Sequence, residues 1–203
     1  QKSNRARERG FVFHHGLRVA KLSLVMAEKH PEGNTLAKDT IFAGGLFHDI
    51  AKGEEPHNET GALRVMTMLN GVCRPDELQE IANLILLHNC RQADNELPLG
   101  AQIIQDADIL DHMGAQMVWL SLFWSAGHDR PPEETIEYYR SDEHQQYLLQ
   151  LLNKLNLPLS ITEFDHRRQL QDSFFRHLAC ELEGCFTESA AMLSQPASGV
   201  AQA

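Results

Sequence analysis

Apolar residues recur at helical spacing through almost the whole chain, and this pattern restricts the fold more than any other feature. Between His15 and Lys29 they fall at Leu17, Val19, Ala20, Leu22, Leu24, Val25 and Met26. Such recurrence predicts a helix with a broad buried face. Similar segments cover residues 34–51, 60–69, 75–88, 98–114, 133–155 and 161–182. Since no segment shows the period of two that marks a strand, we predict an all-α protein.

The predicted helices fall into two groups. Residues 1–125 are expected to form the core of a helical bundle, and residues 126–193 to add C-terminal helices packed on the same domain. The small, polar segment 194–203 is expected to be disordered. A chain of 203 residues is long enough for one sizeable domain of this kind.

The charge balance limits the partners that the chain can bind. It has 18 Lys and Arg against 28 Asp and Glu, a formal net charge of −10. An acidic surface disfavours non-specific binding to nucleic acid or to an anionic membrane. A small anionic substrate stays compatible with it, because a bound cation inverts the local field.

Compartment signals are few. The chain has no apolar run of about 18 residues, so no membrane span is expected. Its four cysteines, at irregular spacings, are typical of reduced thiols in a cytoplasmic protein. The first residue is not Met and no apolar signal core follows, which suggests a trimmed chain or a domain cut from a longer protein.

Two adjacent glycines, Gly44 and Gly45, lie inside the helix predicted over residues 34–51. Each costs about 1 kcal/mol relative to alanine in a helix, so a compensating role is expected. Without side chains, they let another helix come close. Packing of the 15–29 helix there would bring His15 near His48.

A histidine followed directly by an aspartate, His48-Asp49, ends this apolar segment. With His15 upstream and Asp108 downstream, it gives a series of imidazole and carboxylate groups that suits a divalent metal such as Mn, Fe, Zn, Ni or Mg. Neighbours on a helix point about 100° apart, so both can reach one ion only where the helix ends or distorts. The alternative is a helix-end histidine with a capping aspartate. A second pair, His128-Asp129, is interpreted as a surface turn.

Three carboxylates, Asp106, Asp108 and Asp111, crowd one predicted helix beside an apolar stripe. They would repel one another unless a cation lay close by. The alternative is a solvated acidic face.

Taken together, His15-x-x-Arg18-Val19, Leu46-Phe47-His48-Asp49-Ile50-Ala51-Lys52 and Asp106-Ala107-Asp108-Ile109-Leu110-Asp111 resemble the HD-domain superfamily of metal-dependent phosphohydrolases. The resemblance covers about residues 10–114. It implies an HD-domain helical bundle in which His15, His48, Asp49 and Asp108 bind the metal. Asp106 and Asp111 would then be carboxylates that orient the ligands. Asp49 also has a catalytic role by this resemblance.

Two further histidines resemble a dinuclear subset of the superfamily. His57-Asn-Glu-Thr-Gly61-Ala62 is similar to an element of its members, and His88 closes an apolar helix where they carry another ligand. Asp49, His57 and His88 would bind a second ion. Only seven residues separate Asp49 from His57, so we expect one ion and allow for two. The alternatives are that His57 is a loop histidine without a ligand role and that His88 is a helix-end histidine bonded to a carbonyl.

By the same resemblance, Lys52 would contact the phosphate and take part in catalysis, or else favour the helix end as a cation. Arg18 would either pair with an acidic residue or touch the phosphate. The other histidines (His30, His112, His144, His166 and His177) are expected on solvated helix faces.

The function that this implies is hydrolysis of a phosphoester or phosphoanhydride by a metal-activated water. The substrate would be a small phosphorylated compound, with a nucleotide as the first expectation. One alternative is a diiron HD-type oxygenase. Another is a non-catalytic ligand-sensing or partner-binding module, with residues 115–193 as the helical surface of a homodimer or of a longer chain.

Overall fold

The computed structural model describes residues 9–90 and 97–185. Within these ranges the chain is helical and contains no strand, so the all-α prediction is confirmed. The predicted disordered tail lies outside the described residues. The helices are α1 (Phe11–Lys29), η1 (Gly33–Thr35), α2 (Lys38–Phe47), α3 (His57–Met68), α4 (Pro75–Leu87), α5 (Leu99–Asp111), α6 (Ala115–Gly127), α7 (Pro132–Arg140), α8 (Asp142–Leu152) and α9 (Pro158–Leu182).

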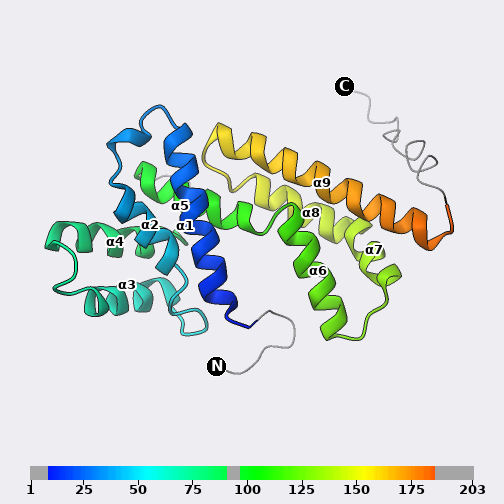
Figure 1. The fold of residues 1–203 in the computed structure, drawn as a ribbon, viewed down its shortest axis with the longest axis horizontal. Coiled ribbons are helices and arrows are strands. Elements are labelled where there is room, and N and C mark those ends of the chain that lie inside the picture. Colours follow the sequence, from blue (N-terminus) through cyan, green and yellow to red (C-terminus); the bar gives the residue numbers. More distant parts are fainter. Residues whose placement is uncertain (1–8, 91–96, 186–203) are drawn as a thin grey trace.

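The helices form two groups joined through α5 (Figure 1). Helix α1 packs on α2 and α5, α2 packs on α4, and α3 pairs with α4. Helices α6, α7 and α9 contact one another in the second group, and α9 also contacts α5. Every helix in the described residues is too short or too polar to cross a lipid bilayer.

The main hydrophobic core is shared between the two groups. Ile104 and Leu110 of α5 are fully buried in it, and so are Leu148 of α8 and Phe164 of α9. A separate small core lies between α6, α7 and α9, where Tyr139 stacks on Phe175 with 4.1 Å between ring centroids. Burial of apolar surface contributes about 25 cal/mol per Å². The shared cluster therefore joins α8 and α9 firmly to the bundle.

Helices α1 and α2 approach each other closely at glycine. A Cβ atom added to Gly45 would lie only 2.8 Å from the Cα atom of Ala20, so this position has no room for a side chain. Gly44 faces the other way, toward the side chains of Leu84 and Ile104. The predicted close approach at the glycine pair is thus confirmed for Gly45, and Gly44 makes room for core side chains.

The single long helix predicted over residues 133–155 is wrong. The structure has two helices there, and Ser141 between them is extended, with φ −65° and ψ 150°. The Ser141 hydroxyl accepts a hydrogen bond of 3.2 Å from the backbone N–H of His144. Serine at such a position satisfies an N–H group that the new helix leaves without a partner. This cap starts α8 and turns the chain.

Several other helix ends differ from the prediction, and two of them lie at predicted ligands. Helix α2 ends at Phe47 rather than at residue 51, and α3 begins at His57 rather than at residue 60. Residues 48–53 form turns instead, and Gly53 has a φ of +94°. This early end of α2 frees the backbone around Asp49 from helical geometry.

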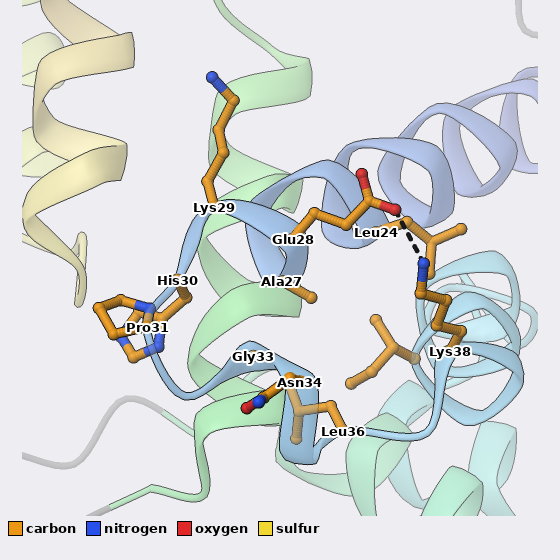
Figure 2. A pocket seen from close by; sticks show the side chains of 11 residues that line it. Leu24, Ala27, Glu28, Lys29, His30, Pro31, Gly33, Asn34, Leu36 and Lys38 are labelled. Atoms are coloured by element: carbon orange, nitrogen blue, oxygen red, sulfur yellow. Dashed lines mark hydrogen bonds and ion pairs between the residues drawn. The ribbon is translucent and has the colours of Figure 1, made fainter.

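A surface hollow of about 500 Å³ lies between the end of α1, η1 and the start of α2 (Figure 2). The Lys38 ammonium and the Glu28 carboxylate pair across it at 2.9 Å, and both side chains are exposed. Such pairs contribute little to stability. The predicted metal ligands do not line this hollow.

Candidate metal centre

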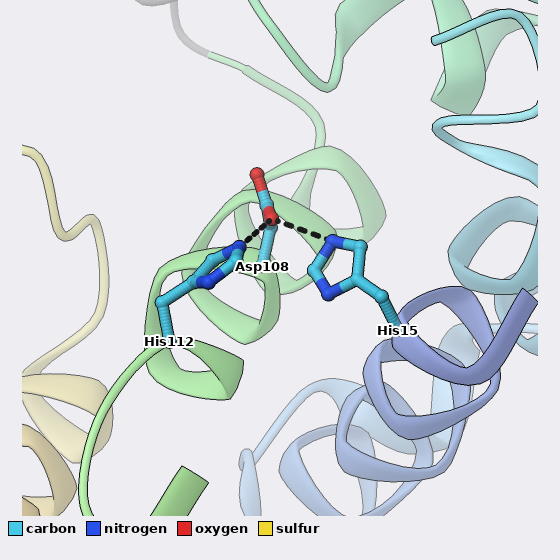
Figure 3. A group of neighbouring side chains, drawn as sticks. All are labelled: His15, Asp108 and His112. Carbon is cyan, nitrogen blue, oxygen red and sulfur yellow. Dashed lines mark ion pairs between the residues drawn. The ribbon is translucent and has the colours of Figure 1, made fainter. Parts of the chain in front are cut away.

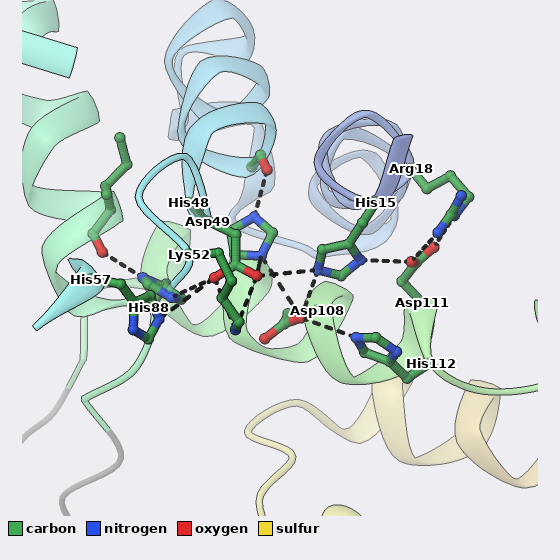
Figure 4. Close-up of polar contacts among 12 residues, drawn as sticks. His15, Arg18, His48, Asp49, Lys52, His57, His88, Asp108, Asp111 and His112 are labelled. Atoms are coloured by element: carbon green, nitrogen blue, oxygen red, sulfur yellow. Dashed lines mark hydrogen bonds and ion pairs between the residues drawn. The ribbon is translucent and has the colours of Figure 1, made fainter. Parts of the chain in front are cut away.

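Five helices bring the six predicted ligands into one cluster (Figure 4). His15 lies on α1, Asp108 lies on α5, and His57 is the first residue of α3. His48 and His88 follow the last residues of α2 and α4, and Asp49 follows His48. All are buried except Asp108, whose side chain is 27% exposed and gives the cluster access to solvent.

The end of α2 makes adjacent residues usable together. His48 directly follows the last helical residue, and Asp49 lies in the turn beyond it. The His48 Nε2 atom and the Asp49 Oδ2 atom are 3.8 Å apart. The prediction that this pair lies at the end of a helix is confirmed. In contrast, His128 and Asp129 are exposed after α6, as the surface-turn interpretation predicts.

A first group of ligand atoms surrounds the Oδ2 atom of Asp49. The Nε2 atoms of His15 and His48 lie 3.9 Å and 3.8 Å from it. The Asp108 Oδ1 atom is 3.2 Å from His15 Nε2 and 3.8 Å from His48 Nε2. Two imidazole nitrogens and two carboxylate oxygens therefore face one small volume, a set typical of a divalent transition metal.

A second group of ligand atoms faces the other oxygen of the same carboxylate. His57 Nε2 and His88 Nε2 lie 3.5 Å and 3.7 Å from Asp49 Oδ1. Asp49 thus stands between two pairs of histidines, with one oxygen toward each pair. This arrangement would let Asp49 bridge two ions.

Hydrogen bonds fix the orientation of these rings. His48 Nδ1 donates to the Gly45 carbonyl at 2.8 Å, and His88 Nδ1 donates to the Ile85 carbonyl at 2.6 Å. Because a carbonyl only accepts, Nδ1 of each ring carries a proton, and Nε2 is the nitrogen that faces the cluster. His57 Nδ1 lies 2.9 Å from a carboxylate oxygen of Glu55 in the same way.

One buried atom tests whether the cluster fits a metal. His48 Nε2 is buried without a hydrogen-bond partner among the described residues. A buried polar atom without a partner costs free energy. A metal ion would complete its bonding, so the residues present fit a divalent cation.

The pKa values of the buried groups reflect this crowding. Burial disfavours the charged imidazolium and lowers the pKa of His48 to about 4, despite the nearby Asp108 and Asp49. Burial also opposes the charged form of His15, but hydrogen bonds to Asp108 and Asp111 raise its pKa to about 9. Burial would raise the pKa of Asp49, yet His88, His48 and Lys52 hold it well below its usual range. Asp49 is therefore an ionised carboxylate that a cation can bind.

Asp111 holds His15 from behind. One Asp111 oxygen is 2.8 Å from His15 Nδ1, and the Arg18 guanidinium donates to both Asp111 oxygens at 2.8 Å and 3.0 Å. Of the two alternatives for Arg18, the structure shows the pairing with an acidic residue. A carboxylate on the far nitrogen of a ligand histidine orients the ring and increases its basicity.

Asp106 has other partners. Its two oxygens accept hydrogen bonds of 2.9 Å from the backbone N–H groups of Asn156 and Leu157, in the loop before α9. The prediction that Asp106 orients a ligand is therefore wrong. Helical spacing explains the difference, since Asp106 and Asp108 lie on different sides of α5.

The prediction of a solvated helix face is wrong for His144, and His112, whose side chain is 34% exposed, also faces the metal centre. His112 Nε2 is 3.9 Å from Asp108 Oδ1, opposite His15 (Figure 3). The spacing of four residues between Asp108 and His112 is a signal that could have found it. His144 is 1% exposed and lies among Tyr138, Tyr139 and Tyr147. His144 lies in the first turn of α8, which exists because the chain breaks into α7 and α8 at Ser141.

Lys52 lies at the rim of the cluster. Its ammonium is 3.0 Å from Asp49 Oδ2 and 3.1 Å from Asp49 Oδ1, and its side chain is 44% exposed. It therefore combines contact with a predicted ligand and access to solvent.

The helical bundle and its buried histidine–aspartate clusters define a metal-binding domain of the all-α class. The HD domain model matches residues 12–113, and the chain belongs to this family. HD domains bind divalent metals, and the clusters described above are suited to that role. No curated protein matches the chain.

Several solved structures share the fold. Bacillus subtilis YpgQ has a TM-score of 0.62 and 18% identity, covering 84% of this chain and 88% of YpgQ. YpgQ in complex with ADP has a TM-score of 0.60 and 16% identity, over 84% and 89% of the two chains. An HD-superfamily hydrolase from Bacillus thuringiensis has a TM-score of 0.61 and 19% identity, over 84% and 85%. The similarity extends beyond residues 12–113 and includes C-terminal helices.

Proposed function

We propose that this chain is a metal-dependent phosphohydrolase that cleaves a phosphoester or phosphoanhydride bond of a nucleotide. The observation that carries the proposal is the position of Asp49, with one oxygen toward His15 and His48 and the other toward His57 and His88. A nucleotide is proposed as the substrate because YpgQ, which has a similar fold, was solved in complex with ADP.

His15, His48, Asp49 and Asp108 would hold the first ion, and Asp49, His57 and His88 the second. A divalent metal bound there supplies a Lewis acid for the phosphoryl oxygens and a nucleophilic water near neutral pH. Pairs of ions in such centres stabilise both the attacking and the leaving oxygen.

The protein side chains supply orientation and charge. Lys52 at the rim can turn its ammonium from Asp49 to an incoming phosphoryl group. Arg18 acts through Asp111, which fixes the His15 ring. Asp108, the most exposed of the six ligands, faces the side from which substrate can enter.

The direct test is phosphate or pyrophosphate release from nucleoside mono-, di- and triphosphates with Mn²⁺ supplied. Asp49→Asn should remove metal and activity together while helical content stays unchanged. The second His-Asp pair offers a matched control, since Asp129→Asn changes an exposed carboxylate away from the cluster. Full metal content and activity in Asp49→Asn would overturn the assignment.

The six clustered ligands also suit a diiron oxygenase. Iron content measured together with oxygen uptake on addition of substrate separates the two chemistries. Absence of product from the whole phosphoester panel, with metal bound and no oxygen uptake, would instead favour a ligand-sensing domain.

A further inference from the structure

A second hollow, of about 760 Å³, opens beside the metal centre between α6, α7 and α8. We call it the aromatic hollow; its walls include Phe11, Trp124, Tyr138 and Tyr147, and His112 lies where it meets the metal centre. Its volume is in the range of pockets that hold small-molecule ligands.

Two of its lining residues touch the metal centre. Phe11 stacks on His15 with 5.4 Å between centroids and 6° between ring planes. His112 Nε2 lies 3.9 Å from Asp108 Oδ1. A molecule with one end at Asp108 can therefore extend past these two rings into the hollow. Burial, and then the charges of Tyr138 and Asp108, raise the pKa of Tyr147.

The walls present aromatic rings to solvent. Trp124, Tyr138 and Tyr147 are 38%, 46% and 41% exposed, although all three line the same hollow. Arg130 covers part of Trp124, with its guanidinium carbon 4.6 Å from the ring centroid. Aromatic faces and a guanidinium plane are the groups on which proteins stack nucleobases.

The charges of the lining determine which end of a ligand enters. Arg130 is 3.7 Å from Glu134, and Glu143 adds a second carboxylate at the start of α8. A phosphate would meet two carboxylates and one paired cation there. A neutral planar ring avoids this repulsion, and its N–H groups can donate to the carboxylates. The phosphates would stay at the metal centre.

We propose that the aromatic hollow binds the base of the nucleotide substrate, with Tyr147 as a base-stacking residue and the phosphates directed to Asp108 and Asp49. This inference rests on the proposed function and deepens it. On this proposal, helices α6, α7 and α8, which follow the metal-binding residues, select the substrate. Stacking of the base would contribute to the free energy of substrate binding.

The test compares a substrate that has a base with one that lacks it. In Tyr147→Ala, the ratio of kcat/KM for ATP to kcat/KM for inorganic tripolyphosphate should fall at least about fivefold, the lower end of the effect of removing one base–aromatic stack. Tyr147→Phe keeps the ring and should keep the ratio. Leu149→Ala, an exposed change on the same helix outside the hollow, is the matched control. An unchanged ratio in Tyr147→Ala would overturn the proposal.

A binding measurement separates this inference from the proposed function. Trp119 and Trp124 are the only tryptophans, so Trp119→Phe leaves Trp124 as the sole tryptophan, whose fluorescence can be excited at wavelengths that the three tyrosines do not absorb. AMP should quench this fluorescence saturably, and pyrophosphate should not. Equal quenching by both, or none by AMP, would reject the base site. If AMP quenches but no phosphoester is cleaved with Mn²⁺ supplied, the proposed function fails and the base site stands.

Discussion

Gly16 of α1 lies directly against the backbone carbonyl of Leu46 of α2. A Cβ atom added to Gly16 would overlap the Leu46 oxygen, and the nearest atoms are backbone, which cannot move aside as a side chain can. Gly16 follows His15, and Leu46 precedes His48 by two residues. The contact therefore fixes the distance between the two helices at the point where both supply a predicted ligand, and the His15 and His48 ring centroids are 5.0 Å apart.

Gly16→Ala should therefore destabilise the protein by about 1–3 kcal/mol, the usual effect of overpacking. It should also weaken metal binding, because α1 must shift away from α2. Gly61→Ala is the matched control, since the nearest atoms to its added methyl are side-chain atoms of Ile85, Ile50 and Ala51, at 3.3 Å, 3.4 Å and 3.9 Å, rather than backbone. Denaturant unfolding and metal titration measure both effects. If Gly16→Ala and Gly61→Ala lost the same amount of stability and of metal affinity, the α1–α2 contact would have no special role.

The helical class could be predicted because it depends on local apolar patterns, whereas the set of ligands was predicted from the resemblance of three motifs to the HD-domain superfamily. Helical apolar spacing identified α1, α4 and α5 closely, and the glycine pair before His48 indicated a close helix contact. The role of Gly16 was not visible, because a single glycine after a histidine carries no sign of the backbone opposite it. That contact depends on two helices meeting in space.

The partners of Asp106 and the burial of His144 could not be predicted for a similar reason. Asp106 binds the backbone of Asn156 and Leu157, about fifty positions along the chain. His144 is buried only because Ser141 ends α7 and starts α8. Each outcome depends on how the C-terminal helices pack, and apolar periodicity alone does not determine that packing.

Asp111→Asn should reduce metal affinity by about 10–100-fold, the usual effect of removing a carboxylate that orients a ligand histidine. The amide keeps the shape of the side chain but loses the charge facing His15 and Arg18. Asp106→Asn is the matched control on the same helix. It should weaken the anchoring of the loop before α9 and lower stability, with metal affinity unchanged. Competition with a chelator gives affinity, and denaturant unfolding gives stability.

The number of ions can be tested at His57. If Asp49 bridges two ions, protein saturated with Mn²⁺ should hold two per chain, and His57→Ala should hold one. His166→Ala removes an exposed imidazole on α9 and should leave the count at two. Metal analysis after removal of loosely bound ions measures the count. One ion in both the unmodified protein and His57→Ala would show a mononuclear centre.

His144 should make stability depend on pH. Burial, then the positive charge of Arg168, lowers the pKa of this histidine in the folded protein, and Asp172 only partly opposes them. In the unfolded chain its pKa is about 6.5. The unfolded state therefore binds the proton more readily, so the stability that neutral His144 contributes is present above about pH 6.5 and is lost as the pH falls below it.

His144→Phe tests this contribution, because phenylalanine fills a similar volume among the three tyrosines and does not titrate. The free energy of unfolding of the variant, minus that of the unmodified protein, should rise as the pH falls from 7 to 5. The upper limit is about 1.4 kcal/mol for each pH unit below 6.5. Taking the difference cancels the other titrating groups, including the buried histidines of the metal centre. A difference that stays constant over this range would mean that His144 takes up its proton equally well in the folded protein.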